Sequence, residues 1–494
     1  MTAHPRASGI LLHPTSLPGP FGIGDLGPAA FAWIDFLRAT RQQLWQVLPL
    51  GPTGFGDSPY QCFSAVAGNP YLVSPELLVH DDLLSSDDLE ALPPFPSDQV
   101  EFGPVIECKV ALLRRAYARF CSAGDVRLRK EFDEFCARQA QWLDDYALFM
   151  ALKDAHGGAV WNTWGPELAA RRPAALHAAR HDLREQIDDH RFRQFLFFRQ
   201  WARLKSYAAD AGVRIIGDIP IFVAFDSADV WQHPALFFLD DAGAPTMVAG
   251  VPPDYFAVTG QLWGNPLFRW DVLKQQGYRW WLERLRAVLE LVDIVRIDHF
   301  RGFESFWAIP SGNPTAEFGE WLPGPGADFF ETLQMELGAL PFIAEDLGFV
   351  TPEVLALRDR FDLPGLKILQ FAFGAEPDAG FLPHHYPRNC VVYTGTHDND
   401  TTVGWYTESA TDAERDFCRR YLGVDGHDIA WDLIRVAWAS VANMALAPLQ
   451  DMLSLGAEAR MNLPGTASGN WRWRFRAGVL DDGLRYRLRE LTEL

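Results

Sequence analysis

Eight short apolar runs, separated by segments with helical periodicity, constrain the fold of this chain more than any other feature of its sequence. Strands that alternate with helices form parallel β/α units, and eight such units close into a barrel of the TIM type, an α/β fold. A doubly wound open sheet is the alternative. The expected strands lie within residues 9–17, 44–52, 213–222, 291–300, 341–349, 365–373, 390–398 and 459–465.

The connections between these runs are uneven, which predicts insertions in the barrel. About 160 residues separate the second and third runs, far more than one β/α connection needs. We expect a single catalytic (β/α)8 unit over residues 1–494. It carries a mainly helical insertion at 75–205, a loop subdomain rich in Pro and Gly at 223–277 that covers the cleft, and a smaller insertion at 303–340.

Charge and cysteine usage narrow the class of ligand and the compartment. With 44 Lys and Arg against 64 Asp and Glu, the formal charge of −20 disfavours nucleic acid and anionic membranes as partners. The six cysteines form no CxxC pair and have no metal-site spacing, and no apolar run is long enough to cross a bilayer. These features predict a cytoplasmic protein with free thiols and no bound metal.

The stretch VRIDHF at residues 295–300 ends an apolar run with charged residues. Side chains alternate along a strand, so Arg296 and Asp298 are expected on one face and Val295 and Ile297 on the other. An Arg and an Asp paired at a strand end indicate either a functional site or a structural ion pair that caps the strand.

Polar residues recur at the ends of the apolar runs. They are His13, Asp218, Asp298, Glu345 and Asp398. Functional residues of (β/α)8 barrels lie at the carboxyl ends of the strands. Structural capping explains one such residue easily but explains the repetition poorly, so this pattern favours a site in the barrel mouth.

Three of these residues have the properties that cleavage of a glycosidic bond with retention requires. Such cleavage uses one carboxylate as nucleophile and a second carboxyl group as acid and base. Asp298 suits the first role because Arg296 favours its ionised form. Glu345 suits the second because it follows three apolar residues, where desolvation keeps a carboxyl protonated. Asp398 is a third carboxylate, placed to bind ring hydroxyls.

Simpler interpretations of these motifs remain open at this level. GDIP at 217–220 could be a turn in which Asp218 caps a helix, and HDND at 397–400 could be a turn or an oxygen-rich metal site. The His residues beside Asp298 and Asp398 also fit a metal-dependent hydrolase, although the chain has no HExxH or HxH motif.

Seven ordered blocks, spread over about residues 8–475, resemble the 4-α-glucanotransferases of glycoside hydrolase family 77, which include the amylomaltases and the plant disproportionating enzymes. The blocks are LLHPTSLPGPFGIGDLG, QVLPLGPTGFGDSPYQ, GDIPIFVA, GVPPDYFAVTGQLWGNPL, IVRIDHFRG, IAEDLG and YTGTHDNDT. Some members have Tyr where this chain has Phe55, which leaves an aromatic ring but removes a hydroxyl.

The resemblance implies roles for particular residues. Asp298 would be the nucleophile, Glu345 the acid and base, and Asp398 the group that stabilises the transition state. Residues implied to bind the glucan are Tyr60, Asp218, Asp254, Tyr255, Phe256, Gln261, Trp263, Asn265, Arg296, His299 and His397.

The resemblance also implies the reaction and its partners. The donors and acceptors would be maltooligosaccharides, amylose or other α-1,4-glucans, with no cofactor, no C-terminal β-sandwich, and a monomer or weak homodimer as the working state. Two other functions stay open: a retaining α-glucan hydrolase on the same barrel, and a non-catalytic glucan-binding protein. The second would be expected to lack one of the three carboxylates, and this chain has all three.

Overall fold

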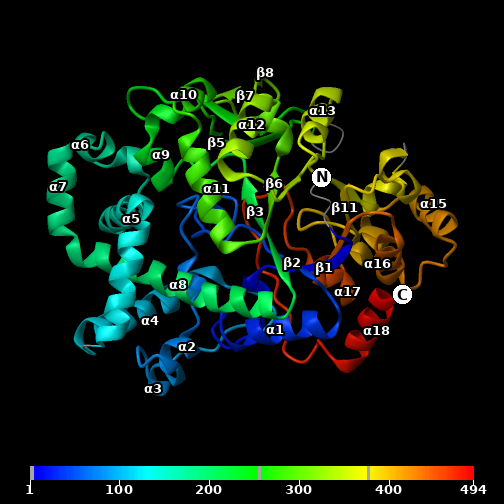
Figure 1. Cartoon of the computed structure of the whole chain (residues 1–494), viewed down its shortest axis with the longest axis horizontal. Coiled ribbons are helices and arrows are strands. Elements are labelled where there is room, and N and C mark those ends of the chain that lie inside the picture. The colour runs from blue at the N-terminus through cyan, green and yellow to red at the C-terminus, as the bar shows by residue number, and fades with distance from the viewer. Residues whose placement is uncertain (1–4, 124, 254–257, 375–378) are drawn as a thin grey trace.

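The computed structural model describes residues 5–123, 125–253, 258–374 and 379–494, and its centre is a closed barrel of eight parallel strands (Figure 1). Around the barrel the strands follow the order β1-β12-β11-β10-β9-β6-β3-β2. They are β1 (Ala7–Leu11), β2 (Leu44–Gln46), β3 (Arg214–Pro220), β6 (Ile294–Asp298), β9 (Phe342–Ala344), β10 (Gly365–Ile368), β11 (Cys390–Tyr393) and β12 (Met444–Pro448). The barrel prediction is confirmed.

The position predicted for the eighth strand, 459–465, is wrong. The strand is β12 at Met444–Pro448, whose sequence MALAP is fully buried and pairs with both β1 and β11. It follows a helix closely and contains two Ala, a residue depleted in strands, so its sequence reads as a continuation of that helix. Residues 449–494, all described, contain helices and no further strand.

The barrel interior is filled by apolar side chains from every strand. The inward-facing set includes Leu44, Ile216, Ile294, Ile343 and Leu366, each at most 2% exposed. Branched side chains of this kind pack well on a pleated surface and fill the interior of an eight-stranded barrel in layers. The centre is therefore a packed core, and a site must lie at one of its ends.

Helices surround the barrel and join its two ends. The barrel helices are α1 (Pro28–Ala39), α8 (Arg184–Asp210), α11 (Arg279–Leu291), α12 (Gly326–Leu337), α13 (Pro352–Arg360), α15 (Asp412–Leu422), α16 (Ile429–Ala439) and α18 (Asp482–Glu493). The C-terminal α18 packs against α1, which follows β1, and against α16, which precedes β12 (Figure 1).

The connection between β2 and β3 forms a helical lobe on one side of the barrel (Figure 1, cyan). Its helices are α2 (Pro75–His80), α3 (Ser86–Glu90), α4 (Phe102–Ala123), α5 (Val126–Ala155), α6 (Pro166–Ala169) and α7 (Pro173–Asp182), followed by α8. Rings from α4, α5 and α8 pack together, with Phe120 stacked on Phe192 at 4.5 Å and Phe132 edge-on to Phe195. The lobe thus has an aromatic core of its own, continuous with α8.

Two insertions that look separate in the sequence, 223–277 and 303–340, form one antiparallel sheet of order β5-β4-β7-β8. Its strands are β4 (Met247–Val251), β5 (Gln261–Pro266), β7 (Ser305–Pro310) and β8 (Glu320–Pro323). This sheet is hard to predict from the sequence for two reasons. Pro and Gly at the strand ends are typical of loops. The central β4–β7 pair also joins segments more than 50 residues apart. We call it the lid sheet, because its strand β5 carries Trp263, whose ring packs against His299 at the end of β6.

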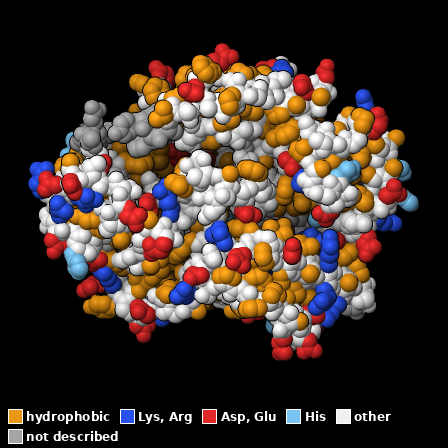
Figure 2. Space-filling view, turned by 180° about the vertical axis from the view of Figure 1, so that it is seen from behind, with side chains coloured by type: hydrophobic (Ala, Val, Ile, Leu, Met, Phe, Trp, Pro, Cys, Tyr) orange, Lys and Arg blue, Asp and Glu red, His pale blue; other side chains and the backbone are white. Residues whose placement is uncertain are grey.

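The surface carries charges of both signs. On the face shown in Figure 2, Asp and Glu lie interspersed with Lys and Arg, and the basic side chains do not merge into one continuous patch. No helix in the described ranges has the length and apolar character that crossing a bilayer requires.

Candidate active site

Three neighbouring strands bring the predicted acidic residues to the carboxyl end of the barrel. β3 pairs with β6 so that Asp218 lies opposite Arg296 and Pro220 lies opposite Asp298. β6 in turn pairs with β9 up to Ala344, the residue before Glu345. Because parallel strands end at the same edge, these side chains share one end of the barrel.

Arg296 joins two of the carboxylates. Its Nη1 donates to both oxygens of Asp218, at 2.8 and 2.6 Å, and to Oδ1 of Asp298 at 2.9 Å. Burial alone would lower the pKa of Arg296, but Asp218 and Asp298 raise it well above its usual value. The Asp298 side chain is 28% exposed while Arg296 and Asp218 are at most 3% exposed. Asp298 is therefore the accessible member of this triad.

Glu345 is held by backbone amides on both of its oxygens. The His299 N–H donates to Oε2 at 2.7 Å and the Leu347 N–H donates to Oε1 at 3.0 Å. His299 has a left-handed backbone with φ of 52°, an uncommon state for a residue with a side chain, and this turn aims its N–H at Glu345. Burial raises the pKa of Glu345 to about 8, although Arg296 opposes the shift. Burial therefore favours the protonated form of this carboxyl group.

A chain of hydrogen bonds connects Asp218 to Asp398. The Tyr60 hydroxyl donates to Asp218 Oδ2 at 3.0 Å and lies 2.8 Å from His397 Nε2. Since that hydroxyl gives its proton to Asp218, His397 Nε2 must donate to it, and the same nitrogen lies 3.3 Å from Asp398 Oδ2. Burial would raise the pKa of Asp398, but His397 and Asn462 hold it below its usual range.

Asn462 is a site residue that sequence reasoning missed. Its Nδ2 donates to Asp398 Oδ1 at 2.6 Å, and its N–H donates to the His397 carbonyl at 3.1 Å. Arg460 Nη2 adds a bond to the Asp398 carbonyl at 2.7 Å. Both residues lie in the run mistaken for the eighth strand. No local pattern marks them, because they lie in irregular chain after β12 and contact Asp398 only through the fold.

The lid sheet meets the site at Trp263 in β5. The Trp263 ring lies edge-to-face with the His299 ring at 4.8 Å, and its Nε1 donates to Gln261 Oε1 at 3.2 Å. Asn265, in contrast, is buried: it donates to the Val223 carbonyl and accepts from Gln61. Asn265 therefore braces the loops, whereas Trp263 borders the site.

The three predicted residues Asp254, Tyr255 and Phe256 lie outside the described residues.

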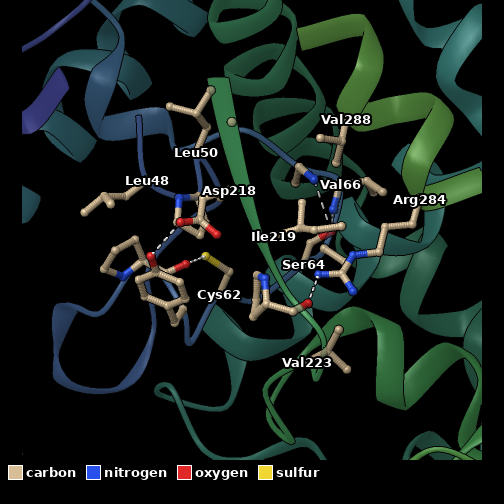
Figure 3. A pocket seen from close by; sticks show the side chains of 18 of the residues that line it. Leu48, Leu50, Cys62, Ser64, Val66, Asp218, Ile219, Val223, Arg284 and Val288 are labelled. Carbon is tan, nitrogen blue, oxygen red and sulfur yellow. Dashed lines mark hydrogen bonds between the residues drawn. The ribbon is translucent and has the colours of Figure 1, made fainter. Parts of the chain in front are cut away.

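A cavity of about 60 Å³ lies behind the strand end that carries Asp218 (Figure 3). Its walls include Asp218 and Ile219 from β3, Arg284 and Val288 from α11, and Cys62. Sites for organic ligands usually enclose about 300–1,000 Å³, so this space is too small to hold a saccharide. It separates the strand end from α11 and is distinct from the open side where Asp298 lies.

Among the described residues, no group of three or more His, Cys, Asp or Glu side chains is arranged to hold a metal ion.

Comparison with known proteins places this geometry in a family. The family described as 4-α-glucanotransferase, glycoside hydrolase family 77, matches residues 12–480. The 4-α-glucanotransferase of Synechocystis is 53% identical over 99% of this chain and 97% of its own length. The enzyme of the same name from Thermus thermophilus is 52% identical over 99% and 98%, and the chloroplastic/amyloplastic one from Solanum tuberosum is 41% identical over 99% and 85%.

A solved structure agrees in fold. Amylomaltase from Streptococcus agalactiae, solved in complex with acarbose, superposes with a TM-score of 0.95 at 39% identity, covering 99% of this chain and 98% of that one. Amylomaltase from Corynebacterium glutamicum, at 19% identity and a TM-score of 0.77, shares the fold. The chain belongs to the 4-α-glucanotransferases of glycoside hydrolase family 77.

Proposed function

We propose that this protein transfers a segment of a 1,4-α-glucan to the 4-hydroxyl of another glucan or of glucose, by double displacement with retention. The observation that carries the proposal is the contrast between the carboxyl groups of one barrel mouth. Asp298 is partly exposed and accepts a hydrogen bond from Arg296, while burial raises the pKa of Glu345 and so favours its protonated form. Pairs of titratable groups whose environments differ in this way are typical of acid and nucleophile assignments.

In the first half of the reaction, a carboxylate oxygen of Asp298 attacks the anomeric carbon of the donor. The bond from that carbon to the leaving glucan oxygen breaks, and Glu345 gives its proton to this oxygen. The products are a β-glucosyl ester on Asp298, an ionised Glu345 and a free glucan. Asp398, kept ionised by His397 and Asn462, would bind ring hydroxyls as positive charge develops on the sugar.

In the second half, the 4-hydroxyl of an acceptor attacks the anomeric carbon from the side that the first glucan left. Its proton passes to Glu345, the ester bond to Asp298 breaks, and the enzyme returns to its starting state. The binding roles proposed for Tyr60, Asp218 and His397 follow from the hydrogen-bond chain that joins them.

Water could replace the acceptor and give hydrolysis. The lid sheet is the part of the molecule that favours transfer, because its β5 residue Trp263 covers His299 beside the nucleophile and reduces the access of water. A sugar acceptor brings binding contacts that water lacks, so a covered ester reacts preferentially with sugar.

The test is incubation with pure maltotriose, with the products followed by chromatography and the reducing ends counted. Transfer gives glucose and a ladder of longer maltooligosaccharides with almost no new reducing ends. Glucose and maltose with rising reducing ends would instead establish a hydrolase. If maltotriose binds but does not react, the protein is a non-catalytic glucan binder, and the proposal fails.

A further inference from the structure

The segment 394–402 carries His397 and Asp398, and its two ends meet at one buried side chain. Thr394 directly follows β11, and Thr402 begins the short helix α14 (Thr402–Gly404). Between them the chain forms a turn in which Asn399 Oδ1 accepts from both the N–H and the hydroxyl of Thr396. A turn with such internal bonds moves as a unit, so whatever fixes its ends also fixes Asp398.

Asp451 is the side chain on which both ends converge. It lies in α17 (Leu449–Met452), directly after β12, and is fully buried. Its Oδ2 accepts from the hydroxyls of Thr394 and Thr402 at 2.5 and 2.8 Å, and its Oδ1 accepts from the Thr402 N–H at 2.7 Å. Three donors on one carboxyl group define the separation of residues 394 and 402.

The free-energy cost of burying the Asp451 carboxyl group indicates that this residue has a specific role. All three donors are neutral groups, and burying a carboxyl group without a cation is unfavourable unless its hydrogen bonds are well made. The barrel itself does not need Asp451, because β11 and β12 are already paired through Val391, Val392 and Tyr393. What Asp451 adds is a fixed path for the chain beyond the strands, where Asp398 stands.

We propose that Asp451 is a positioning residue. Its hydrogen bonds hold both ends of segment 394–402 next to the end of β12 and so fix the position of Asp398 at the barrel mouth. This inference rests on the proposed function, since it gives Asp451 its effect through the carboxylate assigned to transition-state stabilisation. Asp451 itself is buried and makes no contact with substrate.

Substitutions at either end of the contacts test the proposal. Asp451→Asn keeps the shape but replaces one acceptor by an amide donor, and Thr394→Val and Thr402→Val each remove one hydroxyl. Each is expected to lower kcat for maltotriose by up to about 100-fold, because a misplacement of a catalytic group by about 1 Å can cost that much. KM should change by less than about threefold, because Asp398 acts mainly in the transition state.

The matched control is Thr40→Val, which removes an equally buried threonine hydroxyl from the end of α1, where it donates to the Phe36 carbonyl. It is expected to leave kcat unchanged. Circular dichroism and the melting temperature establish that each variant is folded. If Asp451→Asn does not fold, the two threonine variants carry the same test.

A double-mutant cycle separates positioning from general weakening of the fold. On the Asp398→Asn background, Asp451→Asn should change kcat and the affinity for acarbose by less than about twofold, because its route of action is already removed. An undiminished loss on that background, or a wild-type kcat in all three variants, would overturn the proposal. Wild-type transfer in the same assay tests the proposed function separately.

Discussion

At the scale of single residues, the site depends on how differently its carboxyl groups are surrounded. Asp298 is partly exposed and accepts from a guanidinium, Glu345 accepts from two backbone amides where burial raises its pKa, and Asp398 lies beside an imidazole and accepts from a side-chain amide. A carboxyl group next to a cation stays ionised, whereas one in an apolar pocket keeps its proton. The same functional group can therefore fill opposite roles in the proposed reaction.

Glu345→Gln is expected to abolish acid and base assistance while preserving shape. Loss of a positioned acid costs typically 10²- to 10⁴-fold, and we expect kcat/KM for maltotriose to fall by at least 10²-fold. Product formation at high enzyme concentration measures the residual rate. A variant with near-normal turnover would contradict the assignment of Glu345.

The same variant has a pH signature in stability. In the folded state the pKa of Glu345 is raised to about 8 from an ordinary value of 4.5, so the folded protein holds a proton that the unfolded chain releases between these pH values. The contribution of Glu345 to stability is therefore complete below about pH 4.5 and is lost as pH rises through 8. Relative to wild type, Glu345→Gln should gain melting temperature as pH rises from 5 to 8, and a constant difference would contradict the raised pKa.

Arg296→Met leaves two carboxylates without their shared cation. Because Arg296 and Asp218 are almost fully buried, breaking this pair should cost about 3–5 kcal/mol and lower the melting temperature strongly. The control is Arg286→Met, since Arg286 pairs with Glu336 where both side chains are about half exposed, and such pairs contribute about 0–1 kcal/mol. Differential scanning calorimetry compares the two variants. Equal effects would contradict the buried role of Arg296.

At the scale of elements, α8 links the helical lobe to the loops near the site through two glutamines. Gln194 accepts from the Gly68 N–H at 2.7 Å and donates to the Gly68 carbonyl at 2.8 Å. Gln200 makes the same pair of bonds with Ser74, at 2.7 and 3.2 Å. Gly68 lies so close to the Phe197 ring that a Cβ would stand 1.9 Å from it, so only glycine fits there. Residues 68–74 are thus clamped along α8.

The double variant Gln194→Ala/Gln200→Ala should lose this clamp. Three buried backbone groups, the N–H and carbonyl of Gly68 and the N–H of Ser74, would then lack partners, while the Ser74 carbonyl still accepts from the Leu78 N–H. Each such group costs about 1–3 kcal/mol, so we expect a destabilisation of several kcal/mol. Urea unfolding followed by tryptophan fluorescence measures it. Gln275→Ala, at an exposed position of α10 (Trp270–Gln275), is the control and should change stability by less than about 0.5 kcal/mol. A double variant as stable as this control would refute the clamp.

The sequence predicts elements well where an apolar run ends in a polar residue. β3, β6 and β9 fulfil that condition, and their end residues Asp218, Asp298 and Glu345 lie together at the site. β12 fails it, because MALAP has no polar residue to mark its end and its alanines favour a helix. The lid sheet could not be predicted, since its strands are defined by pairing between distant segments rather than by local pattern.

Site residues divide in the same way. Those on strands or in the first turn after them, such as Arg296 and His397, are fixed by a period of two and a short offset. Asn462 lies in irregular chain after β12 and reaches Asp398 from there, and Asp451 is placed by contacts of α17 with both ends of segment 394–402. Neither residue has a local pattern that announces its role, so three-dimensional information was required for both.

At the scale of the whole molecule, the chemistry proposed here is complete without a metal ion. The charges that the reaction needs come from Arg296, His397 and the three carboxyl groups. Dialysis against EDTA is therefore expected to leave the rate of maltotriose disproportionation unchanged within about 10–20%. Measured rates before and after dialysis check this. A loss that Ca²⁺ or Zn²⁺ restores would revive a metal-dependent hydrolase.

Closure of the barrel depends on the last strand to be synthesised. β1 pairs with β2 on one side and with β12 on the other, so the β1 edge that contains Ala7 stays unpaired until Met444 has been synthesised. A ribosome adds about 5–20 residues per second, and roughly 20–90 s pass between these two residues. During that interval the nascent chain presents an unpaired strand edge, which is a template for pairing with other chains. Protection of the emerging polypeptide is consequently needed most before the last barrel strand leaves the ribosome.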